Sequence, residues 1–286
     1  MNSEDKENIF LHQPEFIEED PRAGWPANSG FHVDAAENYQ RHTILFPPEI
    51  VRGKRVLDLG CCNGATGAWV LSNGADFYCG VEVQEQFADG ARDALRKYYP
   101  QDHWSIVCSP VEQFLESCHE RYDLVIAAGV LYAFEDQIKI LRAIAAVANR
   151  VVIESIHPKS MIVEQYLNDS TKKRLLQSGE YRRYIETAAF IELGKQGMVV
   201  PGDNRVMVYS GTRPSMGAVI TIICDCGFDV VRGVNPKLKS ELPHLFSPVR
   251  RFGLQFVRTG EAKNRSHGLA SSLEAEPGTV TIGKWQ

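Results

Sequence analysis

The sequence contains no apolar run long enough to cross a membrane. Its longest apolar stretches, Val147 to Ile156 and Met216 to Cys224, are much shorter than the ~20 residues that a membrane helix needs. The N-terminal residues 1–20 are acidic and lack the apolar centre of a secretory signal. These absences predict a cytoplasmic protein without a membrane partner.

An excess of positive charge is also absent. The 286 residues include 31 Lys and Arg against 36 Asp and Glu, which gives a formal net charge of -5. Nucleic-acid binding depends heavily on neutralising phosphates, so a nucleic-acid partner is not expected. With 44% hydrophobic residues, the chain can bury a sizeable core as one large domain or as a core with an insertion.

The seven cysteines form no Cys-x-x-Cys pair, and their number is odd. Most of them lie in apolar stretches, so reduced, buried thiols are expected rather than disulfides. Cys224 and Cys226 are separated by a single residue, which is not the usual spacing of a structural zinc site. No bound metal is therefore expected.

From Arg55 onward, short β-rich runs alternate with amphipathic segments of helical length. This alternation predicts a doubly wound α/β fold in which helices cover a mostly parallel sheet. Strands are expected at Arg55–Leu59, Asp76–Val83, Trp104–Cys108, Tyr122–Ala127 and Val151–Ser155. Helices are expected after the Gly60–Gly67 turn through Leu71, and at Glu85–Tyr98, Val111–Cys118 and Asp136–Ala148.

The alternation stops after the fifth strand. Residues 157–204 have mixed charges and no strong strand pattern, so a mostly helical insertion that forms a lid is expected. The remaining elements are expected to be a strand at Arg205–Tyr209, a helix at Ser215–Cys226 ended by Gly227, and an antiparallel terminal pair at Phe228–Gly233 and Phe252–Arg258. Residues 279–285 are either a short strand or part of the tail.

The strongest chemical signal is the sequence VLDLGCCNG from Val56 to Gly64, between an expected strand and an expected helix. At such a turn a ligand can approach bare backbone, and this crevice is the ligand site of doubly wound sheets. Glu82 closes the next strand about 20 residues after Gly60, where a carboxylate can accept hydrogen bonds from both ribose hydroxyls. The alternative is a different nucleotide-binding fold such as a nicotinamide dehydrogenase, against which the missing third-glycine spacing counts.

These residues resemble the class I S-adenosylmethionine-dependent methyltransferases, whose first motif runs Asp-x-Gly-Cys-Gly-x-Gly. The resemblance covers roughly Arg55 to Pro158. It implies a Rossmann-like class I methyltransferase fold and S-adenosyl-L-methionine as the cofactor. It also implies the cofactor-binding residues, which are Asp58, Gly60, Cys61 and Gly64 near the methionine part, Glu82 and Val83 near the ribose, Val111 and Glu112 near the adenine, and Gly129 in the fourth motif.

One position departs from this family pattern. Cys62 stands where the family most often has glycine, and its Cβ would crowd the cofactor-binding loop. We therefore expect either a slightly displaced loop or a side chain that points into the protein.

Three stretches are similar to the branch that contains the tRNA wobble-uridine carboxymethyltransferases: Gly74–Glu82, Val111–Phe114 and Gly129–Tyr132. Ala133 follows the Leu-Tyr pair where that branch has a histidine. Together with the acidic charge, this departure favours a small-molecule acceptor over RNA.

Methyl transfer from a sulfonium is an in-line displacement, so the protein mainly aligns acceptor and methyl group and excludes water. The catalytic candidates are His157, Tyr132 and Tyr184. His157 could deprotonate a hydroxyl or amine acceptor near neutral pH, and it could equally be a histidine that caps its loop. The two tyrosines are expected to shape the pocket.

Three further residues are candidates for the substrate pocket. Tyr39 and Tyr181 could face the sulfonium through cation–π contacts, worth about 0.5–2 kcal/mol, although ordinary lid packing also explains a tyrosine. Arg213 could hold a carboxylate of the acceptor, although a surface arginine is the default reading.

Five segments follow from this reading: a leader and cofactor-covering segment (1–45), a cofactor-binding core (46–156), a helical lid and substrate insertion (157–204), a completion of the sheet (205–260) and a tail (261–286). The sequence gives no indication of the oligomeric state.

The leading functional interpretation is methyl transfer to an O or N nucleophile of a small-molecule metabolite, in small-molecule biosynthesis. A second is a lyase or cyclase, in which the amine of S-adenosylmethionine attacks its own γ-carbon and releases methylthioadenosine and azetidine-2-carboxylate. A third is a non-catalytic cofactor-binding protein, to which only Cys62 points.

Overall fold

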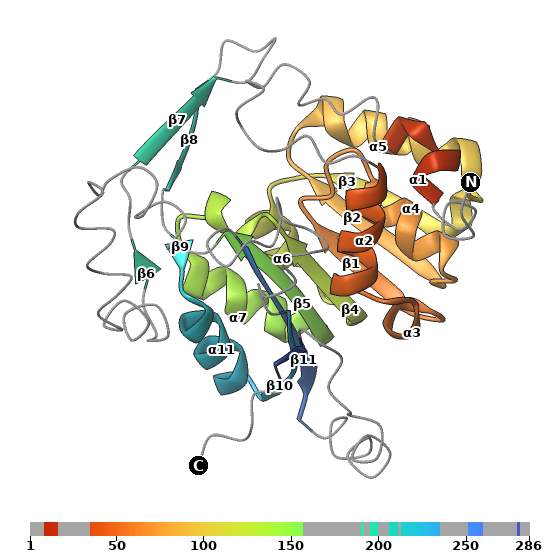
Figure 1. Ribbon diagram of the computed structural model, residues 1–286. Helices are drawn as coiled ribbons and strands as arrows, with labels where there is room; N and C mark the ends of the chain where they lie inside the picture. The colour runs from red at the N-terminus through yellow and green to blue at the C-terminus, as the bar shows by residue number, and fades with distance from the viewer. Residues whose placement is uncertain are drawn as a thin grey trace, which may run out of the picture. The chain divides into compact units, whose positions relative to one another are not determined.

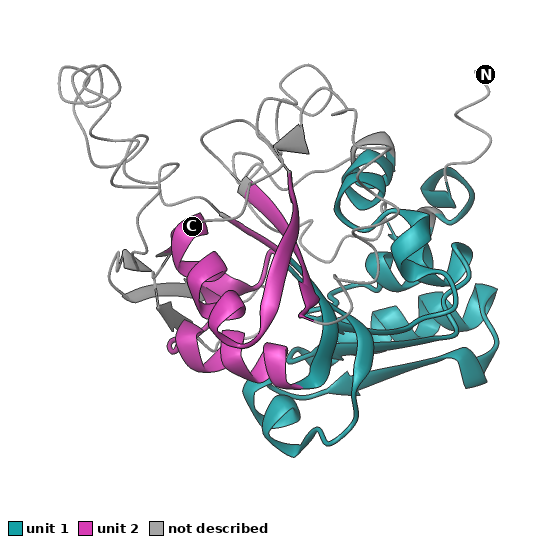
Figure 2. Cartoon of the chain, turned by 90° about the horizontal axis from the view of Figure 1, so that it is seen from below, with its two compact units in different colours: residues 1–128, 147–152 teal, residues 129–146, 153–286 magenta. Residues whose placement is uncertain are grey.

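The computed structural model describes residues 9–16, 35–156, 190–191, 195–199, 206–210, 213–234, 251–259 and 279–280. The chain forms two compact units, one of residues 1–128 and 147–152 and the other of residues 129–146 and 153–286 (Figure 2). Strand β5 (Ala148–Ile156) contributes to both units.

A parallel sheet forms the centre of the first unit. Its strands are β1 (Arg55–Leu59), β2 (Phe77–Glu82), β3 (Trp104–Cys108) and β4 (Tyr122–Ala128), in the order β4-β1-β2-β3, and all three neighbouring pairs are parallel. The strand registers pair Asp58 with Gly80 and Glu82 with Cys108. The carboxyl ends of β1, β2 and β3 therefore lie at one edge of the sheet, as predicted.

Helices follow the strands of this sheet in alternation: α4 (Ala65–Ser72), α5 (Glu85–Tyr98) and α6 (Val111–Ser117), with the short 3-10 turn η5 (Gln101–His103) before β3. The α5 helix has the predicted bounds, because its apolar stripe is buried and Pro100 follows it. At Gly67 in α4, a Cβ would lie 2.5 Å from Cε1 of Tyr78. Glycine at this position allows α4 to approach β2 closely.

The N-terminal part of the chain packs against α4. It contains α1 (Ile9–His12), η2 (Pro14–Phe16), α2 (Ala35–Leu45) and α3 (Pro48–Val51). The α1 helix contacts both α2 and α4, and Figure 1 shows these helices together. Phe10 and Phe16 are buried, and the indole N–H of Trp69 donates to the carbonyl of Phe46 at 3.1 Å. This apolar packing fixes α2 against the helix that follows the glycine-rich turn.

The second unit contains an antiparallel terminal pair. Its elements are η6 (Leu131–Ala133), α7 (Gln137–Val147), the end of β5, α11 (Met216–Asp225), β10 (Phe228–Val234), β11 (Arg251–Arg258) and β12 (Thr279–Val280). The strand order is β12-β10-β11-β5, and β10 is antiparallel to both β11 and β12. Ser215 caps α11 by accepting from the Ala218 N–H at 3.1 Å, and Gly227 (φ +86°) follows it.

The predicted helical insertion is only partly described. Residues 157–189 lie outside the described residues. Within 190–199 the structure has strands instead of helix: β6 (Phe190–Ile191) pairs with β9 (Arg213–Pro214), and β7 (Lys195–Val199) pairs with β8 (Val206–Ser210), both antiparallel. Cross-strand pairing in the β7–β8 hairpin, where the register places Met198 opposite Met207 and Val199 opposite Val206, explains the difference from the expectation.

The fold class is the predicted doubly wound α/β fold with an antiparallel terminal pair. In the described part of the chain, no helix combines the length and the apolar character needed to span a bilayer.

Candidate functional site

The glycine-rich turn between β1 and α4 is held in an unusual backbone conformation. Gly60, Cys62 and Gly64 have positive φ angles of 76°, 49° and 82°. The N–H groups of Gly60 and Cys61 both donate to the Val81 carbonyl, at 2.8 and 3.1 Å. These bonds tie the turn to the carboxyl end of β2.

Cys62 is the one non-glycine residue with a positive φ among the residues that the structure describes. A left-handed conformation costs a residue with a Cβ about 1–2 kcal/mol. Its side chain is half-buried. Glycine therefore suits this position because of the positive φ angle, and not only because a Cβ would crowd the loop.

Glu82, the last residue of β2, binds the turn through its side chain. Its side chain is buried, and its two oxygens accept hydrogen bonds from the N–H groups of Cys62 (3.1 Å) and Gln84 (2.9 Å). Burial raises the pKa of Glu82, and the backbone donors oppose this rise. The backbone donors do not use all the lone pairs of the carboxylate, so it can still accept from a hydroxyl of a bound ligand.

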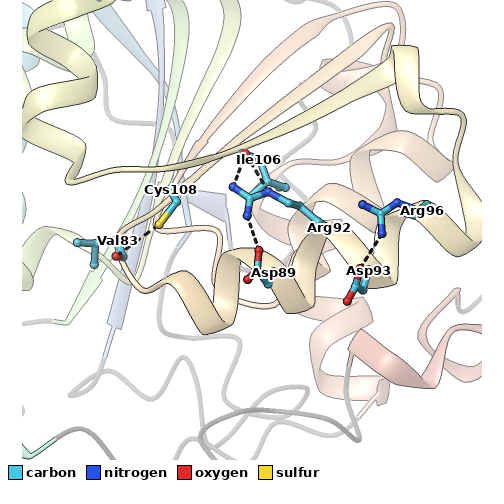
Figure 3. A network of polar contacts seen from close by, with 7 residues as sticks. All are labelled: Val83, Asp89, Arg92, Asp93, Arg96, Ile106 and Cys108. Carbon is cyan, nitrogen blue, oxygen red and sulfur yellow. Dashed lines mark hydrogen bonds and ion pairs between the residues drawn. The ribbon is translucent and has the colours of Figure 1, made fainter. Parts of the chain in front are cut away.

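An exposed apolar residue lies next to this carboxylate. Val83 is 49% exposed, and the exposed thiol of Cys108 approaches its carbonyl at 3.8 Å (Figure 3). Val111 is buried at the start of α6, and Glu112 beside it is half-buried. An apolar surface beside a hydroxyl-binding carboxylate suits a nucleoside.

Arg92 supports the β3 side of this region. From α5, its Nε and Nη2 donate to the carbonyl of Ile106 in β3 at 3.3 and 3.0 Å, and its Nη1 pairs with Asp89 (Figure 3). The guanidinium thereby links α5 to the strand that ends at Cys108.

Asp58 lies at the end of β1, almost fully buried. Its carboxylate accepts a hydrogen bond from Tyr78 Oη at 2.9 Å. Burial raises the pKa of Asp58 to about 7; the Tyr78 hydrogen bond and the positive charge of Arg41 lower it, while Glu82 raises it further. A negative charge at this position is therefore sensitive to pH near neutrality.

Sequence reasoning did not find the neighbours of Asp58. Tyr78 could have been found from the strand register, because Gly80 pairs with Asp58 and Tyr78 lies two residues away on the same face. Arg41 carries no such signal, because it reaches Asp58 only through the packing of α2 against α4.

The residues of the first unit fit S-adenosylmethionine. Glu82 suits a ribose diol, Val83 and Val111 suit the base, and the turn from Gly60 to Gly64 follows directly on the strand that carries Asp58. When it is ionised, the Asp58 carboxylate is a negative charge of the kind that suits a cationic ligand.

Gly129, Tyr132 and Arg213 belong to the second unit. Gly129 (φ +77°) donates its N–H to the carbonyl of Glu154 at 2.9 Å. Tyr132 is half-buried in η6, and buried Gln137 donates from Nε2 to the Leu131 carbonyl at 2.8 Å. Gln137, which the sequence did not single out, thus fixes the turn that carries Tyr132.

Arg213 lies in β9, and the structure brings β9 and β8 into contact with η6. Tyr132 and Arg213 are therefore on neighbouring elements. Tyr39 lies in α2, where its ring meets Trp69 edge-on with centroids 5.2 Å apart. His157, Tyr181 and Tyr184 lie outside the described residues.

The expectation of buried cysteines is only partly correct. All seven thiols are free, but of these only Cys61 and Cys79 are buried. Cys108 is exposed because it ends β3 at the edge of the sheet, and Cys118 is half-buried because it caps α6.

Known proteins are similar to this chain in sequence. Residues 57–150 match a family described as a methyltransferase domain. A ubiquinone biosynthesis O-methyltransferase of Neisseria meningitidis serogroup C (strain 053442) is 25% identical over 175 residues, which cover 56% of this chain and 69% of the relative.

Two solved structures show the same fold. Magnesium protoporphyrin IX methyltransferase from Synechocystis PCC 6803, with bound S-adenosylhomocysteine, has 15% identity and a TM-score of 0.53, covering 90% of this chain and 100% of that one. The N-methyltransferase NodS from Bradyrhizobium japonicum WM9, also with S-adenosylhomocysteine, has 16% identity and a TM-score of 0.51, covering 88% and 99%. The Rossmann-like methyltransferase fold predicted from the motifs is confirmed.

Proposed function

We propose that this chain, an S-adenosylmethionine-dependent methyltransferase by its matched domain, its fold and its relatives, methylates an oxygen or nitrogen nucleophile of a small-molecule metabolite. The observation that carries the proposal is the pairing of the glycine-rich turn with Glu82. The O-methyltransferase relatives and the acidic charge of the chain support a small-molecule acceptor.

The first unit binds and orients the cofactor, which supplies an activated methyl group on a sulfonium. Glu82 accepts the ribose hydroxyls, and Val83, Val111 and Glu112 border the base. The backbone of Gly60, Cys61 and Gly64 carries the methionine part, and the charge of Asp58 beneath it attracts the cationic groups.

Acceptor binding falls to the second unit. Gly129 and Tyr132 follow β4, and β9, which contains Arg213, contacts η6. Tyr132 is proposed to shape the acceptor pocket and Arg213 to hold a carboxylate of the acceptor. His157 is the proposed base for the acceptor, and Tyr184, Tyr181 and Tyr39 are proposed to exclude water.

Three other readings have less support. Three stretches of the sequence resemble the tRNA wobble-uridine carboxymethyltransferases, so tRNA is a second candidate acceptor. It has less support because neither the matched domain nor the relatives reported above point to RNA. The lyase or cyclase reading and the non-catalytic reading gain no support from the relatives.

Mass spectrometry after incubation with S-adenosylmethionine tests the reaction class. We offer a panel of phenolic, carboxylated and amine acceptors. We expect S-adenosylhomocysteine together with a product that is about 14 mass units heavier than one of the acceptors, because a methyl group replaces a hydrogen. Methylthioadenosine formed without any acceptor would overturn the proposal in favour of the lyase.

Glu82→Gln tests the cofactor site directly. Because the amide offers one acceptor oxygen where the carboxylate has two, we expect S-adenosylhomocysteine to bind about 1–3 kcal/mol more weakly by calorimetry. Glu85→Gln, at the exposed start of α5, is the matched control and should bind as the unaltered protein does. Equal affinities for the two variants would reject Glu82 as the ribose ligand.

A further inference from the structure

The N-terminal segment 9–16, which contains α1 and η2, meets the cofactor-binding turn at two consecutive residues. The side-chain Nδ2 of Asn63 donates to the carbonyl of Phe16 at 2.9 Å. The ring of Phe16, which is 1% exposed, lies 3.6 Å from where a Cβ of Gly64 would be. The segment therefore holds the turn through one polar and one apolar contact.

Asn63 makes a second hydrogen bond, in which its side chain is the acceptor. Its Oδ1 accepts from the N–H of Ala65, the first residue of α4, at 3.4 Å. A carbonyl such as that of Phe16 only accepts and a backbone N–H only donates, so the two bonds require this orientation of the amide. Asn63 thereby ties the segment to the start of the helix that follows the turn.

The preceding residue of the turn is held from the other side, by β2. The N–H of Cys62 donates to Glu82, and the positive φ angles of Cys62 and Gly64, 49° and 82°, flank Asn63. A residue with a Cβ persists in such a strained conformation only where the surrounding contacts impose it. The bonds to Glu82 and to Phe16 act on adjacent residues, so both help to keep the turn in this conformation.

A second set of contacts anchors the segment to the end of α5. The hydroxyl of Tyr98 donates to the carboxylate of Glu15, whose two oxygens lie 2.7 and 2.6 Å from Oη, and Nζ of Lys97 lies 3.3 Å from the same carboxylate. The hydroxyl of Tyr99 donates to Oε1 of Gln13 at 3.0 Å. Segment 9–16 is therefore bound to α5 by side chains that belong to neither the turn nor β2.

This anchor is remote from the carboxylate that binds the turn. α5 begins at Glu85, next to the Gln84 N–H that donates to Glu82, and Tyr98 is the last of its 14 residues. A rise of about 1.5 Å per residue places the two ends of the helix about 20 Å apart. A change confined to the Tyr98 hydroxyl therefore has a direct route to the turn through segment 9–16 and Asn63.

We propose that Asn63 is a positioning residue through which the docking of segment 9–16 on α5 favours the cofactor-binding conformation of the turn. Because coupling between two binding events is reciprocal, a bound cofactor in turn favours the docked segment. The link between segment and turn rests on the contacts above. Its effect on cofactor affinity rests on the proposed function.

Amide hydrogen exchange of the cofactor-free protein tests the link without any ligand. Tyr98→Phe keeps the aromatic ring and removes only the hydroxyl that binds Glu15. We expect it to speed exchange about fivefold in residues 9–16 and also in the turn, residues 61–65. Asp93→Asn, which breaks an exposed ion pair with Arg96 on the same helix, is the matched control and should leave the turn unchanged. Unchanged exchange in the turn of Tyr98→Phe would overturn the link.

Asn63→Ser separates the two hydrogen bonds of Asn63. Serine keeps an oxygen that can accept from the N–H of Ala65, but it has no amide donor and is too short to reach the Phe16 carbonyl. In this background, Tyr98→Phe should still speed exchange in residues 9–16 but no longer in the turn. If Tyr98→Phe loosens the turn equally with asparagine or serine at position 63, Asn63 is not the link.

Calorimetry with S-adenosylhomocysteine measures the consequence for the cofactor. We expect Tyr98→Phe and Asn63→Ser each to raise the dissociation constant about fivefold, and the double variant to bind no more weakly than Asn63→Ser alone. Effects that multiply in the double variant would be two independent losses and would overturn the positioning role. Absence of binding by the unaltered protein would overturn the proposed function, while the exchange measurements would still decide the link between segment and turn.

Discussion

In the glycine-rich turn, Cys62 is the residue that has a Cβ and a strained backbone conformation. Cys62 has a φ of 49°. We therefore expect the free energy of unfolding of Cys62→Gly to exceed that of Cys62→Ala by about 1 kcal/mol, because alanine keeps a Cβ in the same conformation. Urea titrations of both variants measure this difference. Equal stabilities would show that the turn relaxes around a Cβ at no cost.

Asp58 makes the stability of the fold depend on pH. Its pKa is about 7 in the folded protein against 3.8 for the ordinary group, so the folded state binds more protons between these values. The stability that this group contributes is complete below pH 3.8 and is lost as the pH rises through 7. We expect Asp58→Asn to be more stable than the unaltered protein at pH 8, by at least ~1 kcal/mol, and the advantage to shrink toward pH 5.

Urea unfolding at pH 5, 6.5 and 8 measures this effect. The control is Asp76→Asn, which alters an exposed aspartate just before β2. An advantage for Asp58→Asn that is the same at all three pH values would contradict the raised pKa.

At the scale of elements, the N-terminal segment 9–16 is bound to the helices beside the turn. Asn63 Nδ2 donates to the Phe16 carbonyl at 2.9 Å, and the Phe16 ring lies 3.6 Å from where a Cβ of Gly64 would be. Glu15 accepts from Tyr98 at 2.6 Å, and that hydrogen bond lowers the pKa of Glu15. This segment therefore packs against the turn and stabilises it.

Replacing the buried ring of this segment should weaken the protein. We expect Phe16→Ala to lower the free energy of unfolding by about 3 kcal/mol, because Phe16 is 1% exposed. Leu11→Ala, on the same segment but at a residue that is 50% exposed, should change it by less than ~0.5 kcal/mol. Denaturant titration measures the free energy of unfolding of both variants. Similar decreases in the two would mean that the packing of Phe16 does not stabilise the turn.

Elements with a local signal were predictable from the sequence, and contacts between distant segments were not. The apolar stripe of α5 and the apolar run of β1 have the predicted bounds, because their periodicity is strong. The β7 strand was missed, because its pairing with β8 outweighs a weak local pattern. The end of β2 at Glu82 was predictable from its spacing, whereas Arg41 reaches Asp58 only through the packing of α2.

At the scale of the whole molecule, the candidate cofactor residues up to Glu112 belong to one compact unit. S-adenosylhomocysteine should therefore slow amide exchange first in residues 60–64, 82–84 and 109–112, and at 100 times its dissociation constant it should add about 2.7 kcal/mol of stability. Hydrogen exchange read by mass spectrometry measures this, with α11 (Met216–Asp225) as the internal reference. Protection confined to α11 would contradict the assignment of the cofactor to the first unit.

The two backbone bonds to Glu82 have a consequence for cofactor engineering. Because the Cys62 and Gln84 N–H groups hold one oxygen each, the carboxylate cannot rotate away to accommodate a different sugar. With Glu82 as the proposed ribose ligand, analogues that lack a ribose hydroxyl should bind more weakly, since the fixed carboxylate loses one of its donors. Analogues with a longer alkyl group on sulfur do not meet this constraint, so the enzyme is better suited to engineering as an alkyl-transfer catalyst than to accepting altered nucleosides.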